Sequence, residues 1–376
     1  MLYTSILGGV IIEIYIFDRE LNFKGIIDKF ISLRYVRRYY RSGEFELQCS
    51  LTLEALILLK RENIIYIKGD VEAAYIEYIN LKQDSEGKEI IIVKGKSLTG
   101  YLNRRIIWGT EIINDTAEKA MRQLVEHNCI NPTDINRKIK NIIFGSLKNY
   151  SEAVNYQVSY KNLGDEIENL SNISDLGHRI NFDIGNRKLI FEVYQGINRS
   201  INQNVNPRAI FSKEFENVLE QAFTDSLNNY RNIALVGGIG EGTNRKLAVV
   251  GNAEGLDRFE IFADQKNLSN ADEENNPISD AEYMNLLIEK GNEVLAEAKE
   301  ILTFDSTINK NSNMEYKKDF DLGDIVTCIS KKCNLVINTR ITEIEEVYEE
   351  KGQSINVTFG NNVPTLIDKI KQKLRG

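Results

Sequence analysis

The pattern of apolar and polar positions divides the chain into two β-rich ends and a mixed centre. Residues 1 to about 108 carry β-branched and aromatic runs broken by polar turns, which predicts about seven short strands. Strands at this spacing are typical of a closed antiparallel barrel or a sandwich. After Thr303 the strand pattern returns, and the turns DLGD, SKK and EKGQ separate its last runs into an antiparallel meander.

Helical periodicity is confined to the centre of the chain. Asp115 and Glu118 have the spacing of a capping box at the start of a first helix. A second helix is predicted over residues 162–177, with Gly177 as its C-cap. A third and longer helix opens with a capping box at Ser279, although Gly291 interrupts its pattern.

These patterns predict an α+β, β-rich fold in which two small antiparallel β-barrel domains bracket a mixed α/β domain. The second barrel would pair the final strands with part of the middle of the chain. The expected domains are 1–108, the N-terminal tube-type barrel; 109–200 with 236–302, the mixed α/β domain; 201–235 with 303–362, the second barrel; and 363–376, a short C-terminal helix.

The last segment, PTLIDKIKQKLRG, predicts an amphipathic helix. An apolar stripe formed by Leu366, Ile367, Ile370 and Leu374 is surrounded by lysines and an arginine. A helix this short is not stable in isolation. We therefore expect it to dock, either on its own domain or on a partner, and these four residues are candidate partner contacts.

The segment RYVRRYYR alternates basic and aromatic side chains, which is also the composition of a single-strand stacking platform. The chain as a whole has a net charge of −8, so it lacks the broad basic field that nucleic-acid binding needs. An ordinary strand whose arginines meet acidic neighbours or another subunit is favoured. Arg34, Arg37 and Arg38 are the candidate contacts, and we expect no stable nucleic-acid binding.

Composition narrows the class of protein further. With 376 residues, 42% hydrophobic and 27% charged, the chain is typical of a soluble globular protein. No window approaches the roughly 18 consecutive apolar residues of a membrane span. The run from Ile6 to Phe17 contains Glu13 and is better explained by a strand than by a signal peptide. Four dispersed cysteines favour reduced thiols and synthesis in a bacterial cytoplasm.

Potential chemical motifs are better explained by structure than by catalysis. VGGIGEG, residues 236–242, lacks the ending of a phosphate-binding loop and is expected to link two strands. Cys328 and Cys333 flank a turn but have no further ligand pair for zinc. His127 and His178, at predicted helix ends, favour capping or dipole contacts. We expect no catalytic residues, no cofactor and no metal.

Four parts of the chain resemble a known family in the same order. One part is Tyr316 to Gly360, which contains a Tyr, then Asp-x-x-x-Gly-Asp-x-Val, then an Arg-Ile strand and a Thr-Phe-Gly ending. Two further parts are Ser42 to Thr52 (SGEFELQCSLT) and Leu189 to Val218 (LIFEVYQGINRS and NPRAIFSKEFENV). The fourth part is Asn228 to Asp264, which contains a Gly-rich loop and GLDRFEIFAD. The chain resembles the non-enzymatic baseplate hub or tail-associated proteins of tailed phages and phage-tail-like particles.

That resemblance implies two similar barrels per chain and a homotrimer whose six barrels continue the sixfold tail tube. The implied partners are the tail tube or distal tail protein, the central spike protein and the baseplate wedge proteins, and the implied location is the baseplate of the particle. The alternative is a tail-associated protein that degrades cell wall or binds carbohydrate. The chain lacks an HExxH or G-x-S-x-G motif, although a pair of carboxylates could still serve a glycosidase.

Overall fold

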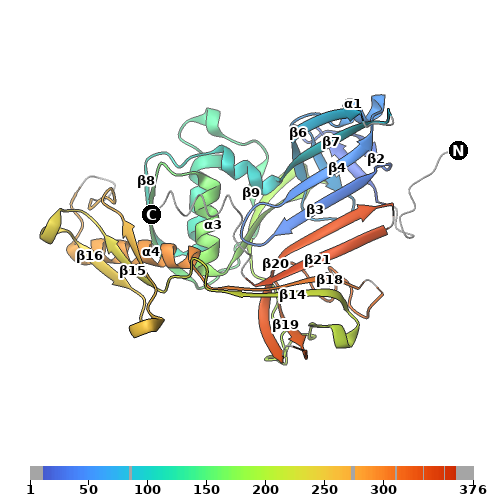
Figure 1. Ribbon diagram of the computed structural model, residues 1–376. Helices are drawn as coiled ribbons and strands as arrows, with labels where there is room; N and C mark the ends of the chain where they lie inside the picture. Colours follow the sequence, from blue (N-terminus) through green and yellow to red (C-terminus); the bar gives the residue numbers. More distant parts are fainter. Residues whose placement is uncertain are drawn as a thin grey trace.

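The computed structural model describes residues 12–83, 87–271, 276–309, 311–332, 334–350 and 352–360. Its N-terminal part is an antiparallel run of strands in the order β3-β4-β7-β6-β5-β1-β2, with α1 (Leu53–Leu58) beside it (Figure 1). The strands are β1 (Ile14–Phe17), β2 (Phe23–Ile27), β3 (Ser32–Arg38), β4 (Glu44–Ser50), β5 (Ile64–Ile67), β6 (Ala74–Gln83) and β7 (Glu89–Ser97). The expected strand pattern of this part is confirmed, and alternation explains it: in β4 the buried side chains are Phe45, Leu47 and Cys49.

The C-terminal strands extend the same sheet. They are β13 (Ile210–Ser212), β14 (Val218–Ser226), β18 (Ile301–Ile308), β19 (Ile325–Ser330), β20 (Leu335–Glu349) and β21 (Gly352–Gly360). The first part of β20 pairs with β19, and its second part lies between β21 and β3. Strand β20 therefore joins the two ends of the chain into one sheet of 13 described strands.

Hydrogen-bonded pairing in this sheet follows an open path. Among the described strands, β2 pairs only with β1 at one end, and β14 pairs only with β18 at the other. The β-rich α+β class is confirmed, whereas the expected closure of two separate barrels is not. Of the run from Ile6 to Phe17, in which a strand is expected, residues 6–11 lie outside the described part, and β1 occupies Ile14–Phe17.

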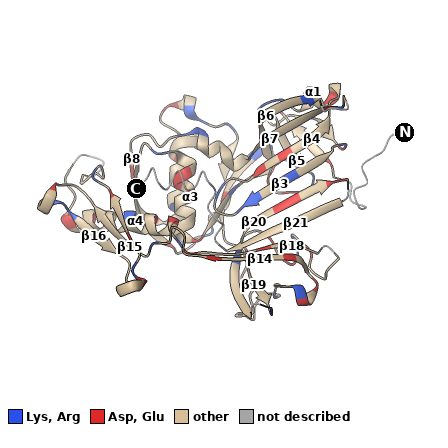
Figure 2. Cartoon of the chain, in the orientation of Figure 1, with Lys and Arg blue, Asp and Glu red and all other residues tan. Residues whose placement is uncertain are grey.

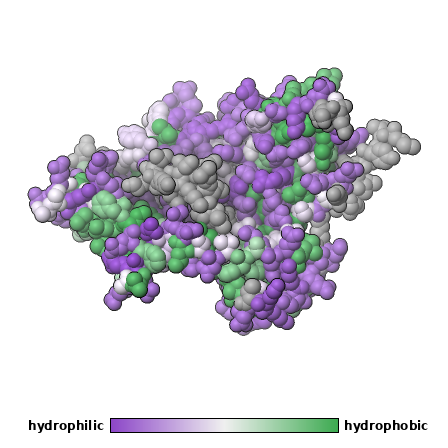
Figure 3. Space-filling model, viewed as in Figure 1, coloured by the Kyte–Doolittle hydropathy of each residue, from purple (hydrophilic) through white to green (hydrophobic). Residues whose placement is uncertain are grey.

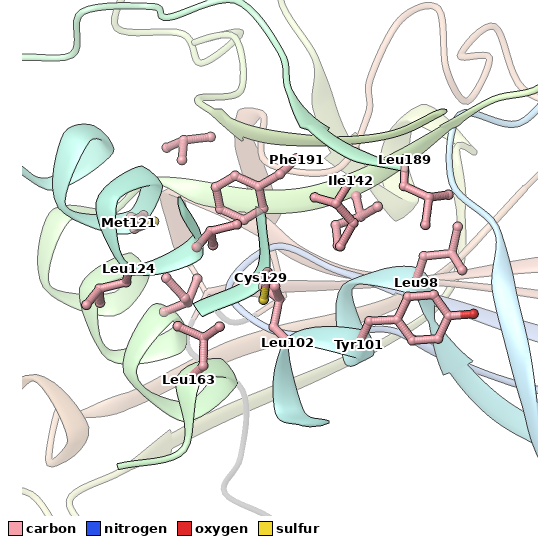
Figure 4. Close-up of a cluster of buried hydrophobic side chains, with 14 of the residues drawn as sticks. Leu98, Tyr101, Leu102, Met121, Leu124, Cys129, Ile142, Leu163, Leu189 and Phe191 are labelled. Atoms are coloured by element: carbon pink, nitrogen blue, oxygen red, sulfur yellow. The ribbon is translucent and has the colours of Figure 1, made fainter. Parts of the chain in front are cut away.

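Two small sheets and two helices form the middle of the chain. Strands β8 (Thr110–Thr116) and β10 (Ala153–Ser159) pair with each other, while β9 (Ile142–Phe144), β11 (Gly177–Asp183) and β12 (Lys188–Tyr194) form a three-stranded sheet. Helices α2 (Ala117–Val125) and α3 (Leu163–Ser174) pack on them. Side chains such as Met121, Leu163 and Phe191 fill the core between these elements (Figure 4). Irregular or single-turn helices occupy Leu98–Arg104, Glu126–Ile130, Ile135–Arg137, Lys213–Phe215, Gly242–Asn244 and Gly255–Asp257.

The ends of two helices differ from the prediction. The capping box expected at Asp115 is wrong: α2 follows Thr116, and the Glu118 carboxylate accepts the backbone N–H groups of Lys148 at 2.8 Å and Tyr150 at 3.2 Å. Helix α3 ends at Asp175, which is left-handed at φ 57°. Gly177 is therefore no C-cap and instead begins β11.

An outer sheet lies apart from the long one. It consists of β15 (Ile233–Gly237), β16 (Leu247–Val250) and β17 (Glu260–Asp264), and α4 (Asp280–Glu297) covers one of its faces (Figure 1). The capping box at the start of α4 is confirmed, because Ser279 and Glu282 cap each other. Close packing explains why a glycine occupies position 291 within the helix. A Cβ on Gly291 would lie 2.5 Å from Val250 Cγ2, so glycine lets the helix approach the sheet closely.

Candidate functional site

Three segments that are distant in the sequence meet where β3 pairs with β20. They are β3 itself, the turn from Tyr316 to Asp324, and the loop after β12 that contains Gly196 and Arg199. The last two segments lie in motifs that carry the family resemblance. We refer to this meeting place, built around Arg37, as the junction.

Arg37 is the centre of the junction and is 1% exposed. Its Nε donates to Glu72 at 2.9 Å, and its Nη1 donates to Asp321 and to the Tyr316 hydroxyl, both at 2.9 Å. Burial alone would lower the pKa of Arg37, but the neighbouring Tyr316, Glu72, Asp70 and Asp321 hold it well above its ordinary value. The guanidinium is therefore charged and ties β3 to the turn before β19.

A second cation crosses the same interface. The Lys317 Nζ lies 3.1 Å from the Asp70 carboxylate and 3.7 Å from that of Glu346 on β20. Burial would raise the pKa of Asp70, yet Arg37 and Lys317 lower it. Burial raises the pKa of Glu346, to which the Tyr348 hydroxyl donates at 2.6 Å. The junction thus holds two cations among several buried or half-buried carboxylates.

The DLGD turn fits the junction by close backbone contact. Gly323 has φ +91°, and a Cβ there would lie 2.4 Å from the Tyr39 ring. A Cβ on Gly196 would lie 2.0 Å from the Gly323 carbonyl, so both positions require glycine. Asp324 accepts the Ile197 N–H at 2.7 Å and the Arg199 Nε at 2.9 Å, which fixes the loop after β12 against the turn.

A further arginine, on β20, also contacts residues of the junction. Arg340 Nε donates to Asp175 at 3.0 Å, and its guanidinium lies 4.9 Å from the centre of the Tyr39 ring. Asp175 is the left-handed residue that ends α3. Arg340 therefore connects the middle of the chain to the long sheet.

The outward arginines of β3 meet acidic neighbours, as the sequence predicts for a strand. Arg34 forms ion pairs with Glu345 and, at 2.9 Å, with Glu44, while Arg38 Nε lies 2.6 Å from Glu343. In Figure 2, basic segments of β3 lie beside acidic segments of the neighbouring strand β20. Contact of Arg34 and Arg38 with another subunit stays a prediction. Arg37 differs from Arg34 and Arg38, because it is buried in the interior of the chain.

Sequence reasoning missed the acidic partners of Arg37 and the residues of the Arg340 contact. One signal was available, since Arg37 shares a strand face with Leu33 and Tyr35 and so occupies an inward position. A charged side chain at such a position needs a buried partner. The sequence does not reveal which carboxylates, because Glu72 and Asp321 come from distant turns.

The glycine-rich loop between β15 and β16 binds a side chain of its own chain. Arg245 Nη2 donates to the Gly237 carbonyl at 2.8 Å, and its Nε donates to the Gly238 carbonyl at 3.1 Å. Ile239 N–H donates to the Tyr283 hydroxyl at 3.0 Å. These carbonyls face a cation, which is the opposite of a phosphate cradle, and the expected link between strands is confirmed.

Three thiols and the His178 imidazole are buried in the interior of the chain. Cys49, Cys129 and Cys328 are buried and unbridged, and burial raises the pKa of Cys49 to about 12, while Cys333 lies outside the described residues. Burial lowers the pKa of His178 to about 3, so this histidine is neutral and bonded to Ser171, and the expected cationic dipole contact is wrong. In the described part of the chain, no group of three His, Cys, Asp or Glu residues is placed to hold a metal ion.

Exposed apolar side chains gather on the outer sheet. On the face opposite α4, Leu235 pairs directly with Val249 and Phe262, and these side chains are 37%, 58% and 45% exposed. Leu247, 49% exposed, lies two residues along β16 from Val249. Hydrophobic residues gather over this part of the surface in Figure 3. A group of neighbouring exposed apolar side chains of this kind is a candidate interaction surface.

The long sheet has two ends, β2 and β14, which each pair with one neighbour among the described strands. The candidate contacts Leu366, Ile367, Ile370 and Leu374 lie outside the described residues. Among the described helices, none combines the length and the apolar character needed to cross a lipid bilayer.

Several solved structures share the fold of this chain. The 43 kDa tail protein of prophage MuSo2 from Shewanella oneidensis has a TM-score of 0.58 and 13% identity, with 92% of this chain and 98% of that chain covered. The prophage tail protein gp18 from Listeria monocytogenes has a TM-score of 0.55 and 15% identity, covering 96% and 98%. The tail protein from Neisseria meningitidis has a TM-score of 0.56 and 10% identity, covering 93% and 97%. This chain therefore shares its fold with these three tail proteins.

Residues 13–361 match the family described as Siphovirus ReqiPepy6 Gp37-like protein. The chain belongs to this family, and the phage tail resemblance expected from its motifs is confirmed. No curated protein matches the chain.

Proposed function

We propose that this phage tail protein is a structural baseplate hub, which forms a ring joining the tail tube to the central spike and the baseplate. The observation that carries the proposal is the long sheet, whose two ends β2 and β14 each pair on one side only among the described strands. Such ends can continue the sheet into neighbouring copies or partners. Similarity to tail proteins over nearly their whole length supports the same role.

The proposal includes a homotrimer in which each chain contributes two barrel-like units. The first would be residues 1–108. The second would combine residues 201–232 with 303–362, because β15 (Ile233–Gly237) pairs with strands of the outer sheet. Residues 109–200 and 233–302 would form the peripheral α/β domain. The junction supports this arrangement, because it fixes β3 of the first unit against β20 of the second through buried charges.

A fold shared with an assembled complex also supports the proposal. A chain of the Francisella PdpA–VgrG complex has a TM-score of 0.50 and 8% identity, with 94% of this chain and 53% of that chain covered. We infer a role in assembly, located at the baseplate of the particle, without enzymatic activity. No described contact specifically favours the alternative of a wall-degrading or carbohydrate-binding protein.

The outer sheet is a surface that assembly would cover. Its apolar face lies beside charges of both signs: Arg245 with Asp264, and Arg258 with Glu260. An apolar centre with a charged rim is typical of protein interfaces. We include this face among the contacts between neighbouring copies.

Light scattering over a concentration series, with and without the spike protein, tests the proposal. We expect a mass of three times 43.0 kDa, alone or with the spike. Leu235→Glu with Phe262→Glu should weaken that trimer, whereas Val205→Glu, at a side chain that is 90% exposed elsewhere, should leave it intact. A persistent monomer in both conditions would contradict the hub and direct attention to glycan binding and cleavage.

A further inference from the structure

Trp108 is the one tryptophan of the sequence, and its side chain is 53% exposed. It lies in the segment between the irregular helix Leu98–Arg104 and β8. Ile107 beside it is buried, whereas Ile106 and Trp108 are exposed. Tryptophan is highly buried on average, and it is enriched at protein interfaces. This exposed tryptophan is therefore a candidate contact with a partner.

An arginine covers one face of the Trp108 ring. The Arg137 guanidinium carbon lies 4.2 Å from the ring centre. Its Nη2 donates to the Asn128 side-chain oxygen at 2.9 Å and to the Ile106 carbonyl. Arg105 Nε donates to the Arg137 carbonyl at 2.7 Å. These contacts hold Trp108, Arg105 and Arg137 together, and we refer to these three residues as the tryptophan cluster.

The two arginines of the tryptophan cluster lack a carboxylate partner among the described residues. Within that part of the chain, every hydrogen bond that their side chains donate goes to a neutral oxygen. Burial and the neighbouring Arg105 lower the pKa of Arg137. By contrast, Arg104 beside them donates to both carboxylate oxygens of Glu62, at 2.6 and 3.0 Å. The cluster thus holds donors that a carboxylate from outside the chain could accept from.

Exposed apolar side chains lie on the segments around the tryptophan cluster. They are Ile106, Ile135 and Tyr160. Ile107 N–H donates to the Lys161 carbonyl at 2.8 Å, so the end of β10 runs beside the segment of Trp108. Ile135 begins the single helical turn that ends at Arg137. Apolar surface is therefore available next to the two unpaired arginines.

Basic side chains outnumber acidic ones on this surface. Three segments meet here, residues 104–110, 131–140 and 159–162. Besides the paired Arg104, they contain Arg105, Arg137, Lys138, Lys140, Lys161 and a single carboxylate, Asp134. This local excess of positive charge contrasts with the net charge of −8 of the whole chain. Charge complementarity therefore favours an acidic partner.

We propose that the tryptophan cluster binds an acidic peptide segment of another protein of the phage tail. A carboxylate of that segment accepts hydrogen bonds from Arg105 and Arg137, and an apolar side chain beside it packs on Trp108. Tryptophan and arginine are among the residues most enriched in binding hot spots. A nucleic-acid base would need an open aromatic face for stacking, and Arg137 covers one face of this indole.

This contact goes beyond the hub proposal and is separate from it in the structure. Its segments belong to the α/β region and include neither of the sheet ends, β2 and β14, nor a strand of the outer sheet. Those other surfaces are the ones assigned above to continuation of the sheet and to contacts between copies. A trimer found by light scattering, with the tryptophan cluster unoccupied, would therefore contradict this inference alone.

Carbodiimide crosslinking of the intact tail particle, followed by peptide mass spectrometry, tests the kind of partner. The reagent joins lysine ammonium groups to nearby carboxylates as amides. Links from Lys138, Lys140 or Lys161 to Asp or Glu residues of a different protein are expected. Links from these three lysines to a second copy of this chain only would overturn the proposal. So would their absence while other lysines of the particle form links.

The single tryptophan provides a second measurement in solution. Full-length protein labelled with fluorotryptophan has one fluorine resonance, because Trp108 has no counterpart in the sequence. The acidic peptide identified by crosslinking, made synthetically, should shift this resonance until the site is saturated. Arg105→Gln with Arg137→Gln should weaken its binding by about 30-fold, as expected for a hot spot.

A matched control removes the same charge elsewhere. Arg187 and Arg208 are exposed and, like the cluster arginines, donate to neutral oxygens. Arg187→Gln with Arg208→Gln should change the affinity by no more than about twofold, because salt screens distant charges. Equal losses in the two double variants would overturn the proposal. A single-stranded oligothymidylate that shifts the resonance with comparable affinity would also overturn it, since the ligand would then be a nucleic acid.

Discussion

The junction around Arg37 and the outer sheet β15–β17 are held together by different interactions. At the junction, buried cations and carboxylates from distant segments meet at hydrogen-bonding distances. The outer sheet has a small apolar core under α4, and its opposite face is exposed and apolar. A buried ion pair demands defined geometry, whereas apolar burial tolerates rearrangement. The junction is therefore suited to fixing the shape of the chain, and the outer sheet to receiving another surface.

The largest effect is expected at the centre of the junction. Arg37→Leu would leave Glu72 and Asp321 without their buried cation, and breaking such a pair costs about 3–5 kcal/mol of unfolding free energy. Urea denaturation followed by circular dichroism measures the loss. Arg34→Leu, at a side chain 41% exposed, is the matched control and should cost about 1 kcal/mol or less. Equal losses would show that burial of the pair is not what stabilises the junction.

The next effect concerns the turn that enters the junction. Gly323→Ala places a Cβ 2.4 Å from the Tyr39 ring at φ +91°, and we expect a loss of about 3 kcal/mol from strain and overpacking together. Gly69 has nearly the same φ, +89°, with nothing within 4 Å of the added Cβ. Gly69→Ala should therefore cost only about 1 kcal/mol of backbone strain. Thermal unfolding of both variants separates backbone strain from overpacking against Tyr39. Similar losses of stability in the two variants would argue against the close contact at Gly323.

Local patterns in the sequence predicted local structure well. Period-two alternation gave the strands at both ends of the chain, and the spacing of Ser279 and Glu282 gave the start of α4. The start of α2 was wrong because Glu118 turns to the backbone of Lys148 and Tyr150 instead of capping its own helix. A local motif fails where a distant segment offers the same side chain a better partner.

The junction could be predicted only in part. The turn at Gly323 and the inward position of Arg37 are visible in the sequence, since each is a local property. The pairing of β3 with β20 joins residues about 300 positions apart, and no local pattern specifies that partner. The sequence analysis therefore names Arg37 together with Arg34 and Arg38 as a candidate partner contact, whereas Arg37 is 1% exposed and lies inside the chain.

The smallest effect is expected at α4, where one carboxylate is buried without full compensation. Burial raises the pKa of Glu293 to about 7, and Glu166 and Glu297 add to this shift while Lys290 opposes it. Tyr156 on β10 also faces this group, with the Lys290 ammonium 4.7 Å from its ring centre. The folded protein thus favours the protonated acid.

A raised pKa fixes the sign of the pH dependence. The protonated Glu293 contributes its full stability below the unfolded value near 4.5, and that contribution is lost as pH rises through about 7. Between pH 5 and 8 the wild-type protein should lose on the order of 1 kcal/mol that Glu293→Gln retains. Denaturation at both pH values measures this difference, with Glu89→Gln at an exposed position of β7 as the control. An identical pH dependence in wild type and Glu293→Gln would mean that neighbouring groups stabilise the ionised Glu293. The buried charge at α4 would then be as well compensated as the buried charges of the junction.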